Sequence, residues 1–284
     1  MVLSTFCGCG GSSLGHRLAG GQVLLAIDHD ADALGIYRAN LPGTPIYQGD
    51  IEQLSVEECC RLAGIRPGEL DILDGSPPCQ GFSPLGKRLF LDQRNQLFVE
   101  FVRLLWGLQP KTFVMENVRG MVRGEMKLIF ADCLEDLKSA GYKVRARLLN
   151  TKYFHVPQDR ERIIFIGVRN DLHAEPSFPR AQSSPQSIRK ALGLVGQGGV
   201  KNDQFKSPWR SLDEPCVTIS KHPPIVSLNG VERKLTFAEC SLLQGFPGDW
   251  KWPKQIHRCL GNAVPPPFMK AVAEHVRDDI LALR

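Results

Sequence analysis

The stretch Val2-Leu3-Ser4-Thr5-Phe6-Cys7-Gly8-Cys9-Gly10-Gly11 joins an apolar, strand-like run to a glycine-rich turn, and the helix-compatible segment Ser12 to Ala19 follows. Glycines let a backbone approach a ligand closely, and the amino end of a helix offers free amide groups. Such a turn is typical of nucleotide-binding α/β folds, although a tight strand-to-helix connection without a ligand explains it equally well.

The alternation of strand-like and helix-compatible segments continues along the chain. It predicts an α/β fold built from βαβ units, with a mostly parallel sheet and helices on both faces. The order of the strands does not follow from it. The further strand-like runs are Val23 to Ile27, Leu70 to Leu73, Thr112 to Met115 and Ile163 to Val168, and the further helix-compatible segments are Gln96 to Gly107 and Lys127 to Ala140.

The composition is that of a globular protein able to bury a substantial core, with 284 residues of which 43% are hydrophobic. The net charge of +5 permits a polyanionic partner without requiring one. The chain starts directly with a strand-like run and has no apolar segment near the roughly 20 residues that span a bilayer, so we expect a soluble cytoplasmic protein without membrane contact. Nine scattered cysteines predict reduced thiols, and no metal site is predicted.

The character of the sequence changes between Asn170 and Glu232, where prolines, a glycine-rich stretch and basic residues replace the long apolar runs. This interval predicts an inserted, loop-rich module. After it, Phe237 to Gln244 and Pro267 to Leu283 are expected to form helices that return to the first domain. The predicted division is therefore 1–169, 170–232 and 233–284.

Three polar motifs lie at the edges of predicted strands. Asp74-Gly75-Ser76-Pro77-Pro78-Cys79-Gln80-Gly81-Phe82-Ser83 follows one strand, Met115-Glu116-Asn117-Val118 follows another, and Gln158-Asp159-Arg160-Glu161-Arg162 precedes a third. A single cysteine is most often a small core residue. A thiol, an acid and a basic pair at strand edges instead indicate a reactive site.

With a late Gly261-Asn262-Ala263-Val264, these motifs and the glycine-rich turn occur in the order found in the C5 cytosine-specific DNA methyltransferases, and the chain resembles the bacterial type of that family from Phe6 to Val264. The resemblance implies a Rossmann-like S-adenosylmethionine-dependent methyltransferase fold with a small target-recognition domain. That domain corresponds to residues 170–232, which are few for the family.

The resemblance also implies roles in catalysis. Carbon 5 of cytosine is a poor nucleophile, so its methylation requires prior covalent addition at carbon 6, which is assigned to Cys79. Glu116 would bind ring nitrogen 3 and the exocyclic amine, Arg162 would bind the carbonyl oxygen, and Arg160 is counted with them. The base must be flipped out of the duplex, and the segment Ser83 to Arg88, with Arg94 near its end, is expected to close over it.

An acid about 20 residues after the glycine-rich turn, Asp28, matches the position that binds ribose hydroxyls in nucleotide-binding folds, and Asp50 is a candidate for the adenine amino group. NAD and S-adenosylmethionine both contain adenosine, and these features do not choose between them. The resemblance implies S-adenosylmethionine. Two departures from the family pattern are Ser4, where many members have aspartate, and His29, where an aromatic residue often covers the adenine. The implied contacts are Phe6, Gly8, Gly11, Asp28, His29, Asp50, Ile51, Pro78, Leu97, Asn262 and Val264.

The partner implied by the resemblance is double-stranded DNA, with a monomeric enzyme that associates with the nucleoid and can have a cognate restriction endonuclease. In the recognition interval, Thr218-Ile219 resembles a short family motif. The other residues there whose side chains suit phosphates or base edges are Arg189, Lys190, Lys201, Asn202, Gln204, Lys206, Arg210, Lys221 and His222.

Three alternatives stay open at this point. A tRNA cytosine-5 methyltransferase of the same fold shares Pro77-Pro78-Cys79-Gln80, although Gly81-Phe82-Ser83 follows the DNA enzymes' pattern. A catalytically idle DNA-binding relative would be expected to lack the cysteine or the acid. A nicotinamide dehydrogenase would leave the pairing of Cys79 with Glu116 unexplained.

Overall fold

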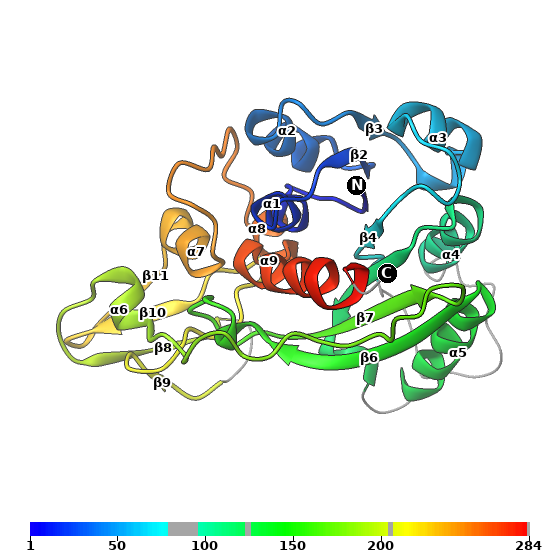
Figure 1. Ribbon diagram of the computed structural model, residues 1–284. Helices are drawn as coiled ribbons and strands as arrows, with labels where there is room; N and C mark the ends of the chain where they lie inside the picture. The colour runs from blue at the N-terminus through cyan, green and yellow to red at the C-terminus, as the bar shows by residue number, and fades with distance from the viewer. Residues whose placement is uncertain (79–95, 123–125, 204–206, 283–284) are drawn as a thin grey trace.

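A computed structural model describes residues 1–78, 96–122, 126–203 and 207–282, with residues 126–129 described as backbone only. A seven-stranded sheet forms its centre, in the order β3-β2-β1-β4-β5-β7-β6 (Figure 1). The strands are β1 (Val2–Thr5), β2 (Val23–Asp28), β3 (Ile46–Gln48), β4 (Ile72–Gly75), β5 (Thr112–Val118), β6 (Tyr142–Asn150) and β7 (Glu161–Arg169).

The mostly parallel sheet that the sequence predicts is confirmed, with one exception at its edge. Strands β1 to β5 are parallel to one another, whereas β7 is antiparallel to both β5 and β6. The cause is the short connection between β6 and β7, which holds only the 3₁₀ turn η3 (Thr151–Tyr153) and no crossover helix. A parallel pair would need a longer crossover than this.

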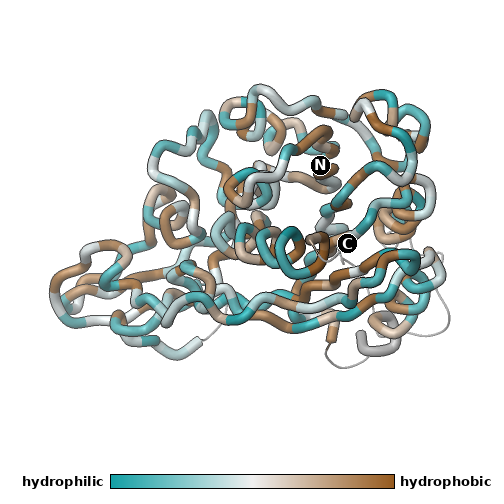
Figure 2. Tube along the Cα trace, in the orientation of Figure 1, coloured by the Kyte–Doolittle hydropathy of each residue, from teal (hydrophilic) through white to brown (hydrophobic). Residues whose placement is uncertain are grey.

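Helices cover both faces of the large sheet, as predicted. On β1, Leu3 packs in one apolar cluster with Phe101 of helix α4 (Gln96–Leu108), whereas its neighbour Val2 packs in another with Phe268 of helix α9 (Pro266–His275). This alternation follows from the pleat of a strand, which sends successive side chains to opposite faces. Hydrophobic residues accordingly recur along the strands (Figure 2). The helices of this part are α1 (Gly11–Leu18), α2 (Ala31–Asn40), α3 (Val56–Ala63), α4 (Gln96–Leu108), α5 (Met126–Ser139) and α9 (Pro266–His275), with the short turns η1 (Ile51–Gln53), η2 (Arg119–Val122) and the π-helical η4 (Val276–Leu281).

A second, antiparallel sheet lies at one end of the molecule, in the order β11-β10-β8-β9 (Figure 1). Its hairpin between β10 and β11 turns at Asn229 and Gly230, both with positive φ (49° and 84°), the conformation that an Asn-Gly turn favours. The sheet ends at Lys234, beyond Glu232, and the division into 1–169, 170–232 and 233–284 stays a prediction. The elements here are α6 (Ile188–Leu192), β8 (Gly198–Lys201), β9 (Arg210–Ser211), β10 (Ile225–Leu228), β11 (Val231–Lys234), α7 (Phe237–Leu243) and α8 (His257–Asn262).

The second sheet shares an apolar core with the first domain. Val200 of β8 and Val226 of β10 belong to the same buried cluster as Leu34 and Tyr37 of α2. The two sheets are therefore joined by packing as well as by the chain. Within the described residues, no helix is both long enough and apolar enough to cross a membrane.

Candidate active site

The glycine-rich turn places a carboxylate at the carboxyl ends of the parallel strands. Phe6 and Gly8 both have positive φ (53° and 54°), and the amide of Gly8 donates a hydrogen bond of 2.7 Å to Oδ2 of Asp28 at the end of β2. The other oxygen of Asp28 accepts from the amide of Asp30 at 2.9 Å. No atom lies within 4 Å of the position that a Cβ would occupy on Gly8, so the turn faces open space there.

Gly11 serves a different purpose from Gly8. A Cβ on Gly11 would stand 2.2 Å from the carbonyl oxygen of Val264, a distance that no side chain tolerates. The turn therefore meets the Gly261-Asn262-Ala263-Val264 segment through direct backbone contact, and the structure brings these two predicted site residues together. The close packing itself requires glycine at this position.

The remaining predicted cofactor contacts lie around the same strand ends. Asp50 follows β3 and caps η1 by accepting from the amide of Glu52 at 3.1 Å, while the neighbouring Ile51 is buried. The imidazole of His29 is 79% exposed, so a flat ligand ring can stack against it. Asn262 and Pro78 are exposed and Leu97 is half-buried.

These residues fit an adenosine cofactor. Phe6 follows β1, Asp28 ends β2 and Asp50 follows β3, and these three strands are neighbours in the sheet. Pro78 follows β4, on the other side of β1. Carboxylates suited to ribose and to an amino group thus share one edge with an open glycine turn. Ligands of open α/β sheets bind in the crevice at this edge.

A buried ion pair joins two of the predicted catalytic residues. Glu116 on β5 and Arg162 on β7 lie on paired strands, and Nε of Arg162 is 2.7 Å from Oε1 of Glu116. Their side chains are only 8% and 12% exposed. Burial lowers the pKa of Arg162, and the charge of Glu116 opposes that shift. The pair presents an acceptor and a donor side by side.

Asn117, for which the sequence predicts no role, holds the main chain at Pro77, two residues before Cys79. Its Nδ2 donates to the carbonyl oxygen of Pro77 at 3.0 Å, and its Oδ1 accepts from the amide of Val118 at 2.8 Å. Asn117 is buried, so this contact anchors the chain shortly before Cys79. Its place in the Glu-Asn-Val motif was the available signal. Cys79 itself, the segment Ser83 to Arg88 and Arg94 lie outside the described residues.

Arg160 is two residues before Arg162 in the sequence, but its side chain contacts other parts of the chain. Its side chain is 1% exposed and donates hydrogen bonds to the carbonyl oxygens of Ile219, Gly261 and Ala263 at 2.9, 2.8 and 3.2 Å. Burial and the neighbouring charge of Arg162 lower the pKa of Arg160, and Glu116 raises it. The contacts favour a positioning role, in which Arg160 ties the recognition interval to the late Gly-Asn-Ala-Val segment.

Two buried glutamines extend this connection. Oε1 of Gln158 accepts from the amide of Ile219 at 3.0 Å, and its Nε2 donates to Oε1 of Gln244 at 2.7 Å. Nε2 of Gln244 in turn donates to the carbonyl oxygen of Ala263 at 2.7 Å. Gln244 was not predicted as a site residue, because its partners are distant in the sequence.

Ser4 is explained by a buried carboxylate. Asp74, 1% exposed at the end of β4, accepts hydrogen bonds from the hydroxyls of Ser4 at 3.0 Å and Ser12 at 2.7 Å, and Nε2 of His16 lies 3.3 Å from its other oxygen. An aspartate at position 4 would bring a second negative charge to this buried place. Serine supplies a donor there instead.

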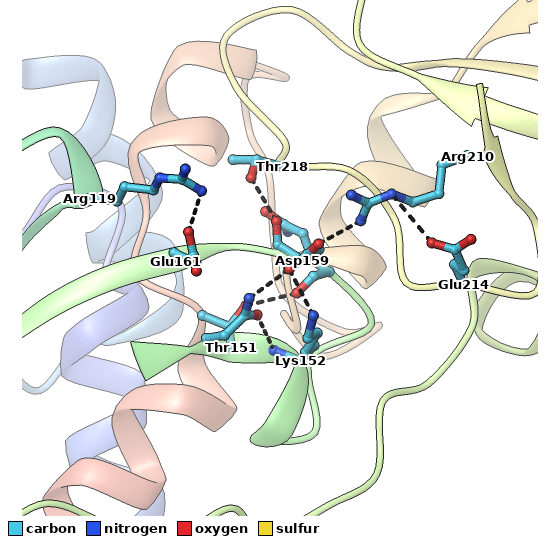
Figure 3. A network of polar contacts seen from close by, with 10 residues as sticks. Arg119, Thr151, Lys152, Asp159, Glu161, Arg210, Glu214 and Thr218 are labelled. Atoms are coloured by element: carbon cyan, nitrogen blue, oxygen red, sulfur yellow. Dashed lines mark hydrogen bonds and ion pairs between the residues drawn. The ribbon is translucent and has the colours of Figure 1, made fainter. Parts of the chain in front are cut away.

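A cleft of about 710 Å³ opens between the two parts of the molecule next to the ion pair. Its cations are matched by acids, as Arg119 pairs with Glu161 and Arg210 pairs with Asp159 (Figure 3). The hydroxyl of Thr218 donates to the carbonyl oxygen of Asp159 at 2.8 Å. The lining includes Val118, Arg119, Lys152, Arg162, Asn202, Trp209, Arg210 and Thr218.

The other basic candidates of the recognition interval are dispersed. Arg189 pairs with Asp213, and Nζ of Lys201 lies 4.1 Å from the ring centre of Trp209. Lys190 and Lys221 are exposed and His222 is partly exposed, whereas Gln204 and Lys206 lie outside the described residues.

The sheet, the open turn with its carboxylates and the buried acid–arginine pair define an α/β enzyme of the methyltransferase class. Comparison with known sequences gives the family: a model of the C-5 cytosine-specific DNA methylases matches residues 1–208 and 197–278. The chain belongs to this family. It is an S-adenosylmethionine-dependent DNA cytosine methylase, since S-adenosylmethionine is the methyl donor of the family.

Individual relatives agree with this assignment. The type II methyltransferase M1.HphI of Haemophilus parahaemolyticus is 34% identical, over 96% of this chain and 86% of its own length. The type II methyltransferase M.AquIA of Picosynechococcus is 33% identical, over 78% of this chain and 90% of its own length.

Solved structures show the same fold. One is a protein of E. coli that is encoded within a prophage and described as a putative DNA modification methyltransferase. It superposes with a TM-score of 0.78 at 22% identity, covering 99% of both chains. Dnmt2 of S. pombe gives 0.72 at 21% identity, over 97% of this chain and 96% of its own. At these identities the likeness concerns the fold alone, so the second match does not favour the tRNA alternative.

Proposed function

We propose that the enzyme methylates carbon 5 of cytosine within one short duplex sequence, with Cys79 as the nucleophile and Glu116 and Arg162 as the groups that bind the flipped base. The observation that carries this proposal is the buried Glu116–Arg162 pair beside the cleft, with Asn117 anchoring the Pro77 carbonyl that leads to Cys79. Glu116 and Asn117 are neighbours on β5, Arg162 lies on the paired strand β7, and the anchored Pro77 is two residues before Cys79 in the sequence.

The chemistry needs each of these groups. Attack of the Cys79 thiolate on carbon 6 forms a carbon–sulfur bond and moves electron density onto ring nitrogen 3 and the carbonyl oxygen. Glu116 binds the protonated nitrogen and Arg162 binds the oxygen, so both stabilise the charge that develops in the ring. S-adenosylmethionine supplies the methyl group as an electrophilic sulfonium. Loss of the carbon-5 proton and departure of the thiolate then restore the aromatic ring.

The proposed cofactor contacts are those at the strand ends. Asp28 would hold the ribose hydroxyls, Asp50 the adenine amino group and His29 a face of the adenine, while the open turn at Phe6 and Gly8 admits the cofactor. Gly11 and Val264 shape this pocket by packing against each other. Ile51, Pro78, Leu97 and Asn262 complete the proposed lining.

The residues between 170 and 232 are proposed to read the target sequence. Arg210, Asn202 and Thr218 support this, since they line the same cleft as Arg162. We also propose that the enzyme acts as a cytoplasmic monomer on chromosomal DNA, with or without a cognate endonuclease. Gel filtration of the pure protein tests whether it is a monomer. Cleavage of unmethylated DNA by an extract of its source cells tests for a cognate endonuclease.

The decisive test is base-resolution mapping of 5-methylcytosine in a plasmid from a methylation-free host that expresses the protein. Cys79→Ala is the control for chemistry, and Glu116→Gln keeps the size of the acid while removing its charge. We expect one recurring methylated sequence with the wild type, none with Cys79→Ala and a large loss with Glu116→Gln. An unmodified plasmid from soluble wild-type protein, together with methyl transfer to tRNA, would overturn the proposal.

A further inference from the structure

Asp159 occupies a central position in the cleft that the methylation chemistry does not explain. It lies between Gln158 and Arg160, and its carboxylate accepts hydrogen bonds from Nδ2 of Asn150 at 2.6 Å and Nη1 of Arg210 at 2.7 Å. Nζ of Lys152 is 3.2 Å from the same carboxylate (Figure 3). One acid thus holds a cation from each of the two parts of the molecule.

The setting makes these pairs stronger than ordinary surface pairs. The side chains of Asp159, Lys152 and Arg210 are 25%, 23% and 30% exposed, so water screens them only in part. Burial by itself would raise the pKa of Asp159, but the hydrogen bonds from Asn150, Arg210 and Lys152 outweigh it and lower the pKa. Asp159 is therefore an anion at neutral pH.

Both cations line the cleft in which duplex DNA is proposed to bind. Lysine and arginine in such a cleft are the usual partners of phosphate groups. Here the carboxylate of Asp159 already binds both cations, at the positions where a phosphate oxygen would bind them. A phosphate that approaches Lys152 or Arg210 must first displace Asp159.

From this arrangement we infer that Asp159 is an internal counter-ion, a carboxylate that competes with DNA phosphates for Lys152 and Arg210 and so weakens the binding of any duplex. The inference rests on the proposed function, because it takes the cleft to be the DNA site. Asp159 is a positioning residue in this scheme, since it does not touch the Glu116–Arg162 pair. A low affinity for arbitrary DNA would speed the release of wrong sequences and of product.

Salt dependence gives a specific readout. Each phosphate contact adds about 0.9 to the slope of log affinity against log salt concentration. Asp159→Asn keeps the shape and an acceptor but removes the charge. Lys152 thereby loses its ion pair with Asp159, and Arg210 keeps only the weaker one with Glu214, whose Oε2 lies 3.7 Å from Nε of Arg210. We expect the slope on an arbitrary duplex to steepen by about 1 to 2, and affinity at low salt to rise about tenfold.

Two variants serve as controls. Asp171→Asn makes the same change of net charge, but its partner is Arg169 at the far end of β7. Asp159→Glu keeps the charge in the cleft. The slope of both should stay near that of the wild type.

The experiment is fluorescence-anisotropy titration of a random-sequence duplex at several salt concentrations, with a thermal melt of each variant. The inference is supported if Asp159→Asn, but neither control variant, binds the duplex more tightly and with a steeper salt dependence. Weaker binding, or an unchanged slope, overturns it, and weaker binding with a lowered melting temperature would show a purely structural role. Plasmid methylation by the same wild-type preparation separates the two hypotheses: if it is present, an unchanged slope refutes only the counter-ion, and if it is absent the proposed function itself fails.

Discussion

Replacing Arg160 by methionine separates a positioning role from a catalytic one. Methionine preserves the unbranched shape of the side chain but removes all three hydrogen bonds to carbonyl oxygens. The carbonyl of Ala263 keeps a donor in Gln244, whereas Ile219 and Gly261 lose the guanidinium contacts. The variant therefore leaves two buried acceptors without these donors.

The expected loss of stability is the sum of two opposing effects. An unsatisfied buried acceptor costs about 1 to 3 kcal/mol, so two cost about 2 to 6 kcal/mol. Removing a buried charge regains part of this, because the guanidinium no longer has to be desolvated. We expect a net loss of about 2 to 4 kcal/mol, which lowers the melting temperature by about 5 to 15 °C for a chain of this size.

The assay is thermal and urea unfolding of wild type and Arg160→Met, with Arg162→Met as the matched control. Arg162 makes a side-chain pair with Glu116, so its variant should lose activity and be destabilised where β5 meets β7, because the buried Glu116 is left unpaired, without loosening the recognition interval. Hydrogen exchange at Ile219 and Gly261 should rise in Arg160→Met only. A melting temperature within about 2 °C of wild type, with activity lost, would refute the positioning role and make Arg160 a catalytic contact.

Three further predictions follow from single contacts. Gly11→Ala should destabilise the fold by about 2 to 3 kcal/mol and weaken S-adenosylmethionine binding in calorimetry, because the new methyl group meets the Val264 carbonyl; normal melting and binding would contradict the close packing. Ser4→Asp should destabilise the protein at pH 8 more than at pH 5, since the carboxylate beside Asp74 has a raised folded-state pKa and its penalty disappears as it takes up a proton; a pH-independent difference in melting temperature would argue against this. Asn117→Ala should lower the single-turnover rate about tenfold or more while cofactor affinity stays within about twofold, and an unaltered rate would show that the anchor does not matter.

Local patterns in the sequence predicted the α/β class, the mostly parallel sheet and the position of the acid after β2, because strand periodicity and strand-to-helix turns depend on neighbouring residues. The reversed direction of β7 was not predicted, since it depends on the absence of a crossover helix after β6. The Asn229-Gly230 turn was an available signal for the hairpin of the second sheet, but the surrounding prolines suggested only loops.

The candidate site was predicted in part for the same reason. Glu116 and Arg162 stand in motifs, and the structure confirms that they lie together. The partners of Arg160 are 59 or more residues away in the sequence. One partner of Gln244 is the main-chain carbonyl of Ala263. No pattern along one chain specifies such distant carbonyl groups, because they become neighbours only when the two sheets dock.

The contacts that Gln158 and Arg160 make with the recognition interval involve main-chain atoms of Ile219. Main-chain atoms are the same for every amino acid. The side chains around this attachment can therefore be exchanged while the attachment itself is kept. Under the proposed function, one catalytic body can in this way accept successive recognition sequences, and a new DNA specificity can arise by substitution without a new domain interface.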